Sequence, residues 1–502
     1  MPPSPDGPTL DALTRRAGEI ARDARPVIDG GRVDPIADSV FELVNPATGA
    51  QLCSVPACAD ADVDRAVASA QRAWQDGRWA ALAPSARAVI LHRFADAIAA
   101  NAQTLGLLDT LQMGMPAQQA IGGIAEAADM VHAAAEMVEA QTDQVMPSAP
   151  TALYLQMRRP QGVVAAITPW NYPVHVALAK VAPALATGNC VILKPSEIAP
   201  LACLRLAELA AEAGVPPGVF NALPGTGPGA GRALALHHGV DCLAFVGSTA
   251  TGLQLMQYAG QSNVKRLLLE CGGKSPQIVF DDLGDAAGVA DAIVAGFTHN
   301  SGQICVSGSR IILVGALYDR LLPLLAERVA ALTIGDPLDP ETRLAPLASA
   351  AQAEKVRRHL HEGTQHAALC ASGHDASGAG TAVAPHLFAV ADPDIALAQE
   401  EIFGPVGAVL RCDDADQAVR LANATRYGLS ATIWARDLAL AHRVTAQLRA
   451  GFVFTYAVAA PSPPGVRYLS GEPFGMSGFG VDGGQLGMQS YTRVQAVGYL
   501  MG

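Results

Sequence analysis

The feature that most constrains the fold is an alternation of short apolar runs with helical stretches, which begins near Gly162. Runs rich in Val, Ile and Leu, such as GVVAAI, CVILK and CLAFV, are each followed by a segment whose apolar residues recur at helical spacing. Strands that alternate with helices of this length predict a parallel sheet with helices on both faces. The first series ends with KRLLLE at Glu270, and a second series begins near Ser275. We therefore expect an α/β protein.

The rest of the chain suggests additional parts. Its 502 residues are too many for one compact core, so two or three domains are expected. Residues 1–25 look like a Pro-rich tail that ends in a short charged helix. A pair of short strands is expected around residues 26–56, and Ala-rich helices over residues 60–141. SYTRVQAV near the C-terminus alternates as a strand does, and the Pro/Gly-rich stretch 460–471 predicts a loop.

Composition excludes several classes of partner. The formal charge is −12 and no basic run stands out, which argues against nucleic acid and anionic membranes. No clean run of about 18 apolar residues predicts a membrane helix. The first ten residues do not resemble a signal peptide. The nine cysteines contain no CxxC pair, which indicates free thiols in a reducing compartment rather than disulfides. We expect a cytoplasmic protein.

One cysteine, Cys305, lies in the stretch NSGQICVSGSR, where a helical pattern stops before the next strand. A buried cysteine usually acts as a small hydrophobe. A cysteine flanked by small residues at a break between elements can instead be reactive. By itself this position leaves both interpretations open.

Polar side chains follow several strands of the first series. Asn171 lies in PWNYP after the first strand, and Lys194 and Glu197 lie at the end of the second. Glu270 ends the last strand, where nearby apolar surface would raise its pKa toward that of a general base. In open α/β sheets, ligands lie beyond the carboxyl ends of the strands. Each residue alone is better explained as an ordinary strand end or turn, but together they share one edge.

Two further stretches suit a phosphate-bearing ligand. Gly247 and Ser248 lie where the strand CLAFV meets a helix, and free N–H groups at a helix N-terminus can bind a pyrophosphate. The alternative is that Ser248 only caps the helix. The run PGTGPGAG, which ends at Gly231, has no strict GxGxxG pattern. It fits a nucleotide turn and a simple tight turn equally well.

Six signatures occur in order: PWNYP, GNCVILKPSE, FVGST, LECGGKSP, NSGQICVSGSR and EEIFGPV. With them the chain resembles the NAD(P)-dependent aldehyde dehydrogenase superfamily from about Val27 to Val497. The resemblance implies that Cys305 is the nucleophile, Glu270 the general base and Asn171 an oxyanion donor together with the Cys305 N–H. An aldehyde would then become a carboxylic acid through a thiohemiacetal and a thioester on the sulfur.

The resemblance also implies a cofactor site for NAD, with NADP possible. Glu197 favours NAD, because a carboxylate near the ribose 2′ position repels a phosphate. No metal is implied. The expected cofactor-binding residues are Trp170, Lys194, Glu197, Gly227, Gly231, Gly247, Ser248, Glu401 and Phe403.

The implied architecture is a Rossmann-like cofactor domain, a second α/β catalytic domain and a small β oligomerisation extension, in a homodimer or homotetramer. The tail would occupy residues 1–25. The cofactor domain would comprise 26–145 and 162–272, the catalytic domain 273–472, and the oligomerisation segments 146–161 and 473–502.

This chain departs from the usual pattern at several places, among them an Asn that relatives often have after the strand near Gly451, where this chain reads FVFTYAV. Many relatives read PFGGxKxSG near the end, where this chain has the shorter PFGMSGFG without the lysine. Many relatives also have a glutamate at the position of Arg493. That glutamate often meets a basic residue at a subunit contact, and Arg266 is the matching candidate here. Two arginines cannot form that ion pair, which puts the usual subunit contact in question.

The expected substrate pocket is open. Ala179 replaces a bulky aromatic residue, Val176 is of modest size, and Ile304 and Val306 flank the nucleophile. This pattern favours a medium-sized or bulky apolar aldehyde as the small-molecule partner.

Two other functions remain possible: a cysteine hydrolase or esterase without redox chemistry, and a non-catalytic descendant of the fold. The remaining reactive side chains have simpler explanations. Cys271 is expected to be packed. A loose group of histidines follows no familiar zinc spacing. Its members, with their acidic and thiol neighbours, are His359, His361, His366, His374, Glu362 and Cys370.

Overall fold

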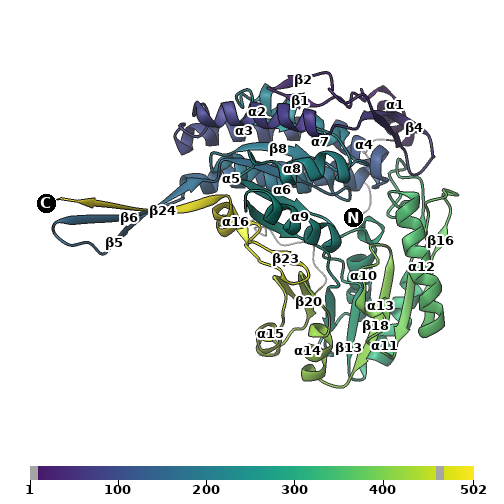
Figure 1. The fold of residues 1–502 in the computed structure, drawn as a ribbon. Coiled ribbons are helices and arrows are strands. Elements are labelled where there is room, and N and C mark those ends of the chain that lie inside the picture. Colours follow the sequence, from purple (N-terminus) through teal and green to yellow (C-terminus); the bar gives the residue numbers. More distant parts are fainter. Residues whose placement is uncertain (1–8, 459–467, 502) are drawn as a thin grey trace.

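The structure is a computed structural model that describes residues 9–458 and 468–501. Two α/β lobes lie one above the other in Figure 1, and a β arm projects from one side. Part of the expected loop at 460–471 falls outside the described residues. None of the helices in the described ranges has the length and apolar character needed to cross a membrane.

The first sheet contains the predicted strand series. Its order is β2-β1-β9-β8-β7-β10-β11-β23, and its five central strands are parallel. The predicted α/β class is confirmed. The strands are β1 (Val27–Ile28), β2 (Gly31–Arg32), β7 (Val163–Ile167), β8 (Cys190–Lys194), β9 (Phe220–Ala222), β10 (Cys242–Val246), β11 (Arg266–Glu270) and β23 (Gly478–Phe479).

Helices connect these strands and share one apolar core with them. In α6 (Pro173–Ala186), Pro173 occupies the first turn, where its missing N–H is no loss and its fixed φ suits a helix. The other helices in this lobe are α2 (Asp60–Gln75), α3 (Pro84–Ala100), α4 (Ala102–Met113), α5 (Ala117–Glu139), α7 (Leu201–Glu212), α8 (Arg232–Leu236), α9 (Thr249–Gln261) and α16 (Gly484–Ser490).

The N-terminal segments match their expectations. The charged helix is α1 (Leu10–Glu19), and the strand pair is β3 (Val40–Val44) with β4 (Gln51–Pro56). Its turn is stabilised by Asn45, whose side-chain oxygen accepts the Ala47 N–H at 2.9 Å. An Asn side chain commonly stabilises a turn in this way.

The second sheet has the order β15-β17-β18-β13-β12-β20-β21, and all its neighbours are parallel except the edge pair β15–β17. Its strands are β12 (Pro276–Val279), β13 (Arg310–Val314), β15 (Ala368–Ser372), β17 (His386–Val390), β18 (Val406–Cys412), β20 (Ser430–Trp434) and β21 (Phe452–Tyr456). Its helices are α10 (Ala286–Thr298), α11 (Leu317–Ala330), α12 (Ala350–His366), α13 (Ala396–Gln399), α14 (Ala415–Asn423) and α15 (Leu438–Thr445). Two short pairs complete the lobe: β14 (Thr333–Ile334) with β16 (His374–Asp375), and β19 (Tyr427–Gly428) with β22 (Phe474–Gly475).

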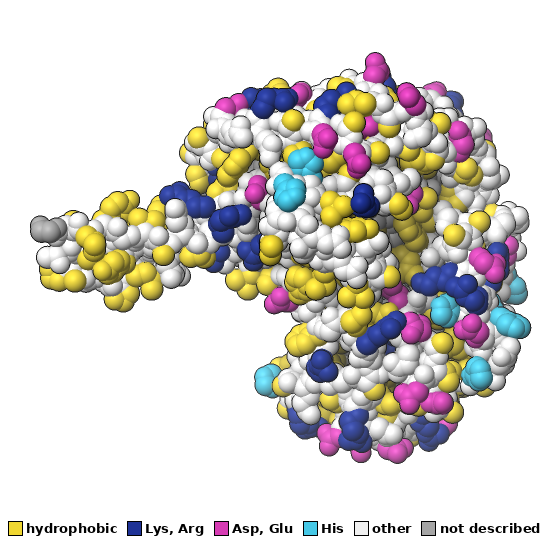
Figure 2. All heavy atoms as spheres, viewed as in Figure 1, with side chains coloured by type: hydrophobic (Ala, Val, Ile, Leu, Met, Phe, Trp, Pro, Cys, Tyr) yellow, Lys and Arg dark blue, Asp and Glu magenta, His cyan; other side chains and the backbone are white. Residues whose placement is uncertain are grey.

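The arm is an antiparallel sheet of β5 (Gln144–Met146), β6 (Ala152–Pro160) and β24 (Thr492–Leu500). It carries exposed apolar side chains, with Lys and Arg side chains where it joins the body (Figure 2). At its base, Arg493 donates to the side-chain and backbone oxygens of Gln161, each at 3.2 Å. Arg266 donates to the Thr492 carbonyl at 3.0 Å. Both arginines therefore have partners within the chain.

The first sheet has a topological switch point between β7 and β10. From β7 the chain proceeds through β8 and β9 toward one edge, and from β10 through β11 toward the other. The register pairs Ile167 with Lys194 and Val246 with Glu270, so the carboxyl ends of four strands lie at one edge. Ligands of open α/β sheets bind at such a point.

Candidate active site

The three residues expected to perform catalysis line one cavity. Asn171, Glu270 and Cys305 all border a space of about 410 Å³. Asn171 follows β7, Glu270 ends β11, and Cys305 lies in the loop between α10 and β13. The two lobes therefore contribute to the same cavity, as their shared position beyond the strand ends predicts.

The loop before Cys305 is held in an unusual conformation. Asn300, Ser301 and Gly302 all have left-handed backbone, with φ of 48°, 54° and 73°. Non-glycine residues rarely adopt this conformation, and it persists only when surrounding contacts enforce it. Here the Asn300 amide donates to the Asn171 carbonyl at 2.9 Å, which ties the loop to the end of β7.

The Asn171 side chain has a defined orientation. It is buried, and its Nδ2 donates to the Gln303 carbonyl at 2.9 Å. An Asn amide has two N–H donors, so one remains for a second acceptor. This arrangement fixes an amide beside the loop that carries Cys305.

The electrostatic surroundings of Cys305 oppose a thiolate in the free protein. Burial raises the pKa of its thiol to about 12, and the charges of Glu401 and Glu270 act in the same direction. A cysteine becomes reactive when a positive neighbour stabilises its thiolate. The sulfur is therefore protonated until positive charge arrives beside it.

The Glu270 carboxyl is poised between its two protonation states near neutral pH. Burial raises its pKa to about 8, the Lys180 ammonium lowers it, and Asp482 and Glu472 raise it. Its Oε1 is buried without a hydrogen-bond partner among the described residues. Lys180 itself is 2% exposed and forms an ion pair with Asp482 at 2.8 Å.

Sequence reasoning missed the role of Lys180. The sequence did contain an indication of this role, because Lys180 is the only Lys, Arg, Asp or Glu in the apolar helix α6. Such a charge is seldom buried without a partner. Asp482 could not have been paired with it from the sequence, because the two residues lie far apart along the chain.

The expected ribose-binding residues lie at the end of β8. Lys194 is buried and forms an ion pair of 3.6 Å with the half-exposed Glu197. Beside them, at the end of β7, the Thr168 hydroxyl is buried and has no hydrogen-bond partner among the described residues. Orphaned buried polar groups are uncommon and often face a ligand site.

Two turns that contain glycine were expected to bind the phosphate-bearing part of the cofactor. The Gly247 N–H already donates to the Glu270 carbonyl at 3.0 Å. The Ser248 hydroxyl accepts the Thr251 N–H at 3.2 Å, so Ser248 does cap α9. Gly227 and Gly231 bound a turn that follows β9, which is separated from β10 by β8 and β7.

The residues expected beside the nicotinamide, Glu401 and Phe403, belong to the second lobe. Glu401 accepts the Gly273 N–H at 3.0 Å, just beyond the end of β11. Phe403 has a φ of 61°, and its carbonyl accepts a hydrogen bond of 2.8 Å from Gln352. The rings of Phe403 and Trp170 meet edge to face with centroids 5.3 Å apart.

The cavity wall combines the expected small apolar residues with polar side chains. Val176, Ala179, Ile304 and Val306 do line it. They share the wall with polar side chains, so the cavity offers both apolar and polar surface to a substrate. The polar residues include Gln119, Glu126, Tyr172, His175 and His299.

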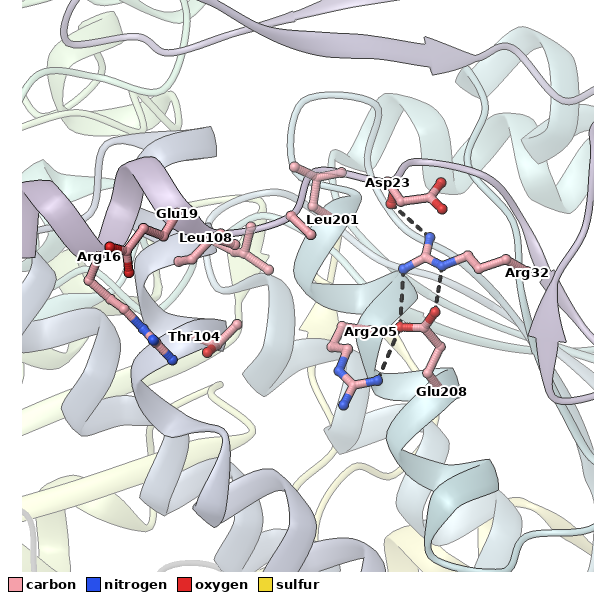
Figure 3. Close-up of a pocket in the computed structure, with 11 residues that line it drawn as sticks. Arg16, Glu19, Asp23, Arg32, Thr104, Leu108, Leu201, Arg205 and Glu208 are labelled. Atoms are coloured by element: carbon pink, nitrogen blue, oxygen red, sulfur yellow. Dashed lines mark hydrogen bonds and ion pairs between the residues drawn. The ribbon is translucent and has the colours of Figure 1, made fainter.

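A second cavity, of about 400 Å³, lies between α1, α4 and α7 and contains none of the expected site residues. Arg16 and Thr104 lie on one side of it and Arg32, Arg205 and Glu208 on the other (Figure 3). Glu208 forms ion pairs of 2.6 Å with Arg32 and 3.3 Å with Arg205. The charges on that side are thus paired with one another.

The remaining reactive side chains show no comparable arrangement. Cys271 is 4% exposed and packs in the core of the first lobe, as expected. His359 and His366 border a third cavity, of about 420 Å³. Within the described parts of the chain, no group of three or more His, Cys, Asp or Glu side chains is placed to hold a metal ion.

Comparison with known families decides the identity of the fold. A family model described as "Aldehyde dehydrogenase family" matches residues 33–497. The chain belongs to the aldehyde dehydrogenase family. The resemblance found in the six signatures is thereby confirmed.

Individual aldehyde dehydrogenases are similar over almost their full length. The NADP/NAD-dependent aldehyde dehydrogenase PuuC of Escherichia coli is 39% identical over 489 residues, which is 96% of this chain and 97% of the relative. The aminoacetaldehyde dehydrogenase of Pseudomonas aeruginosa is 40% identical over 86% of each chain.

Solved aldehyde dehydrogenase structures share the fold. The aldehyde dehydrogenase KauB from Pseudomonas aeruginosa has a TM-score of 0.94 at 39% identity, covering 98% of this chain and 100% of that one. The indole-3-acetaldehyde dehydrogenase AldA of P. syringae, solved with NAD+ and IAA, has a TM-score of 0.94 at 38% identity with the same coverage.

Proposed function

We propose that this aldehyde dehydrogenase oxidises an aldehyde to the carboxylic acid with NAD as the hydride acceptor. The observation that carries the proposal is the convergence of Cys305, Glu270 and Asn171 on one cavity at the switch point of the first sheet. A nucleophile, a base with a raised pKa and an oriented amide donor are what acyl chemistry of this kind requires.

Cys305 is the proposed nucleophile. Its thiol loses a proton to water, and the sulfur attacks the carbonyl carbon to form a thiohemiacetal whose oxygen is negative. Collapse of the oxyanion releases a hydride, for which bound NAD would be the acceptor, and leaves a thioester on Cys305. This use of a covalent intermediate divides one difficult oxidation into two easier steps.

Asn171 is the proposed oxyanion donor. Because its side chain is held by the Gln303 carbonyl, one N–H is fixed in direction before the substrate arrives. A preorganised donor of this kind contributes a factor of about 10²–10³ in rate. The Cys305 N–H is the proposed second donor.

Glu270 is the proposed general base for the second half of the reaction. The carboxylate takes a proton from water, the hydroxide attacks the thioester carbon, and the acid leaves as the Cys305 thiolate is released. With a pKa of about 8, Glu270 can accept a proton and return it near neutral pH.

The residues at the switch point fit a dinucleotide. The orphaned Thr168 hydroxyl, the buried Lys194 ammonium and the Glu197 carboxylate lie at adjacent strand ends and can bind ribose hydroxyls. Glu401 and Phe403 are proposed to hold the nicotinamide half, with Trp170 packing against Phe403. When bound, the oxidised nicotinamide supplies positive charge beside the sulfur and accepts the hydride.

The remaining expected contacts stay part of the proposal in altered form. Because the Gly247 N–H is bound within the protein, we assign the pyrophosphate to the first turn of α9 after Ser248. Gly227 and Gly231 follow β9, nearer the adenosine side. Glu197 favours NAD over NADP, although the similar PuuC is named for both cofactors.

A spectrophotometric assay tests the function. The purified protein, mixed with NAD and a panel of aldehydes, is expected to form NADH in step with carboxylic acid. Ester hydrolysis that is indifferent to NAD, without NADH formation, would instead support a cysteine hydrolase. Absence of both activities would support a non-catalytic protein.

Two substitutions should move the pH profile in opposite directions. Lys180 lowers the pKa of Glu270 and Asp482 raises it. Lys180→Met should therefore shift the rise of kcat toward higher pH, and Asp482→Asn toward lower pH, each by about one unit. Measurement of kcat between pH 6 and 10 checks this. Shifts of both variants in the same direction would contradict the proposed role of the pair.

The arm of β5, β6 and β24 is the proposed oligomerisation surface of a homodimer or homotetramer. Its outer strand carries Val494, Tyr499 and Leu500, which are 57%, 54% and 78% exposed. Apolar side chains along a projecting sheet commonly mark an interface. Sedimentation of the protein as a monomer at micromolar concentration would contradict the assignment.

A further inference from the structure

We propose that Glu126 selects aldehydes that carry a positive charge at the end remote from the carbonyl. The inference rests on the proposed function, because it assumes that the aldehyde occupies the cavity beside Cys305. Glu126 projects from α5 into the wall of that cavity. Cys305, Glu270 and Asn171 lie on other elements of the same cavity, so we assign Glu126 to substrate binding rather than to the chemistry.

Glu126 lies among the polar side chains of the cavity wall. Its charge acts on Tyr172, His175 and His299, which all border the same space. Tyr172 and His299 stack with ring centroids 6.3 Å apart, and Gln119 forms hydrogen bonds with both of them, at 3.2 and 3.0 Å. These side chains place the carboxylate beside an ordered polar wall.

The charge of Glu126 is not compensated from within the protein. Among the described residues that line the cavity, Lys180 is the only Lys or Arg, and it is paired with Asp482. Burial lowers the pKa of His175 and of His299, so both imidazoles are neutral at pH 7. Glu126 itself has no hydrogen bond or ion pair with any other described residue.

Two other acids at the cavity, Asp109 and Glu270, are less inclined to carry a negative charge because they are buried. Burial raises the pKa of Asp109 well above its usual value and that of Glu270 to about 8, which favours the neutral form of both, and Asp482 is paired with Lys180. The cavity therefore presents one solvated carboxylate to an incoming substrate. An ammonium or guanidinium group complements that charge, whereas a carboxylate is repelled.

The inference is tested with aldehydes of matched shape. The probes are 3-aminopropanal, its neutral isostere butanal, and the anionic succinic semialdehyde, each with NAD at low ionic strength. The wild type should show the highest kcat/KM for the amine and the lowest for the anion. Glu126→Gln should lower kcat/KM for the amine about fivefold and leave butanal within twofold, which is the size expected for a solvent-exposed ion pair.

Glu139→Gln is the matched control, because it makes the same chemical change on the same helix about 20 Å away. It should leave the three values unchanged. Equal kcat/KM for the amine and butanal, or an equal effect of Glu126→Gln on both, would overturn the proposal while leaving the dehydrogenase function intact.

A second measurement does not require turnover. Propylammonium should protect Cys305 from iodoacetamide more strongly than 1-propanol does, and this difference should disappear in Glu126→Gln. Mass spectrometry of the labelled peptide reports the protection. If no aldehyde is oxidised, the proposed function fails, and the protection assay still decides the role of Glu126. Equal protection by the two compounds would overturn that role.

Discussion

Replacement of Cys305 by alanine should reduce aldehyde oxidation by a factor of about 10⁴ or more, because the covalent steps have no other nucleophile. The half-buried sulfur borders the cavity that Asn171 and Glu270 share. Its removal should leave the melting temperature almost unchanged, since alanine fits the same space. The rate of NADH formation with a saturating aldehyde, and a thermal unfolding curve, measure the two effects.

Cys271→Ala provides the matched control. Cys271 lies next to Glu270 in the sequence, but its side chain is 4% exposed and packs in the core. Its loss should cost some stability, as a small core cavity does, and leave most of the activity. Parental activity in Cys305→Ala, or a complete loss of activity in Cys271→Ala at a temperature where it is folded, would reject Cys305 as the nucleophile.

The strand and helix series could be predicted because its pattern is strong and local. Runs such as CVILK and CLAFV are continuous apolar segments, which is typical of strands buried on both faces. Asn171, Lys194 and Glu270 could be grouped from the sequence alone, because parallel strands bring their carboxyl ends to one edge. The observed register of Val246 with Glu270 shows how directly this reasoning works.

Other features depended on tertiary contacts that no local pattern contains. The Gly247 N–H is used by the Glu270 carbonyl because β10 and β11 are neighbours, so the expected pyrophosphate donor is already occupied. The identity of the polar side chains at the cavity depends on which face of α5 and of the loop after α10 borders it. Glu126 and His299 therefore could not be assigned to it from spacing alone.

The acidic groups near Cys305 affect both halves of the proposed reaction. Burial of the thiol, followed by the charges of Glu401 and Glu270, raises the pKa of Cys305. A protein that places acids beside its nucleophile must acquire positive charge before the sulfur reacts. Cys305 should accordingly react slowly with iodoacetamide in the free protein, which limits unwanted oxidation of the sulfur.

Replacement of Glu270 by glutamine should block the second half of the reaction and leave the first half in place. Glutamine has nearly the same shape but cannot accept the proton of water. Steady-state turnover should fall by about 10²–10⁴-fold, the range for loss of a general base. Rapid mixing with aldehyde and NAD should still produce a burst of NADH close to one equivalent per active site. Mass spectrometry should then find the acyl group attached to Cys305.

The pH dependence separates this role from a structural one. In the wild type, deacylation requires the ionised carboxylate, so its rate should rise with pH through the Glu270 pKa of about 8. Glu270→Gln should lose that rise, and added hydroxylamine, which attacks a thioester without a base, should restore turnover. Glu139→Gln should keep the wild-type profile. If Glu270→Gln gave no burst, Glu270 would instead be needed before hydride transfer, and the proton acceptor for Cys305 would be this carboxylate.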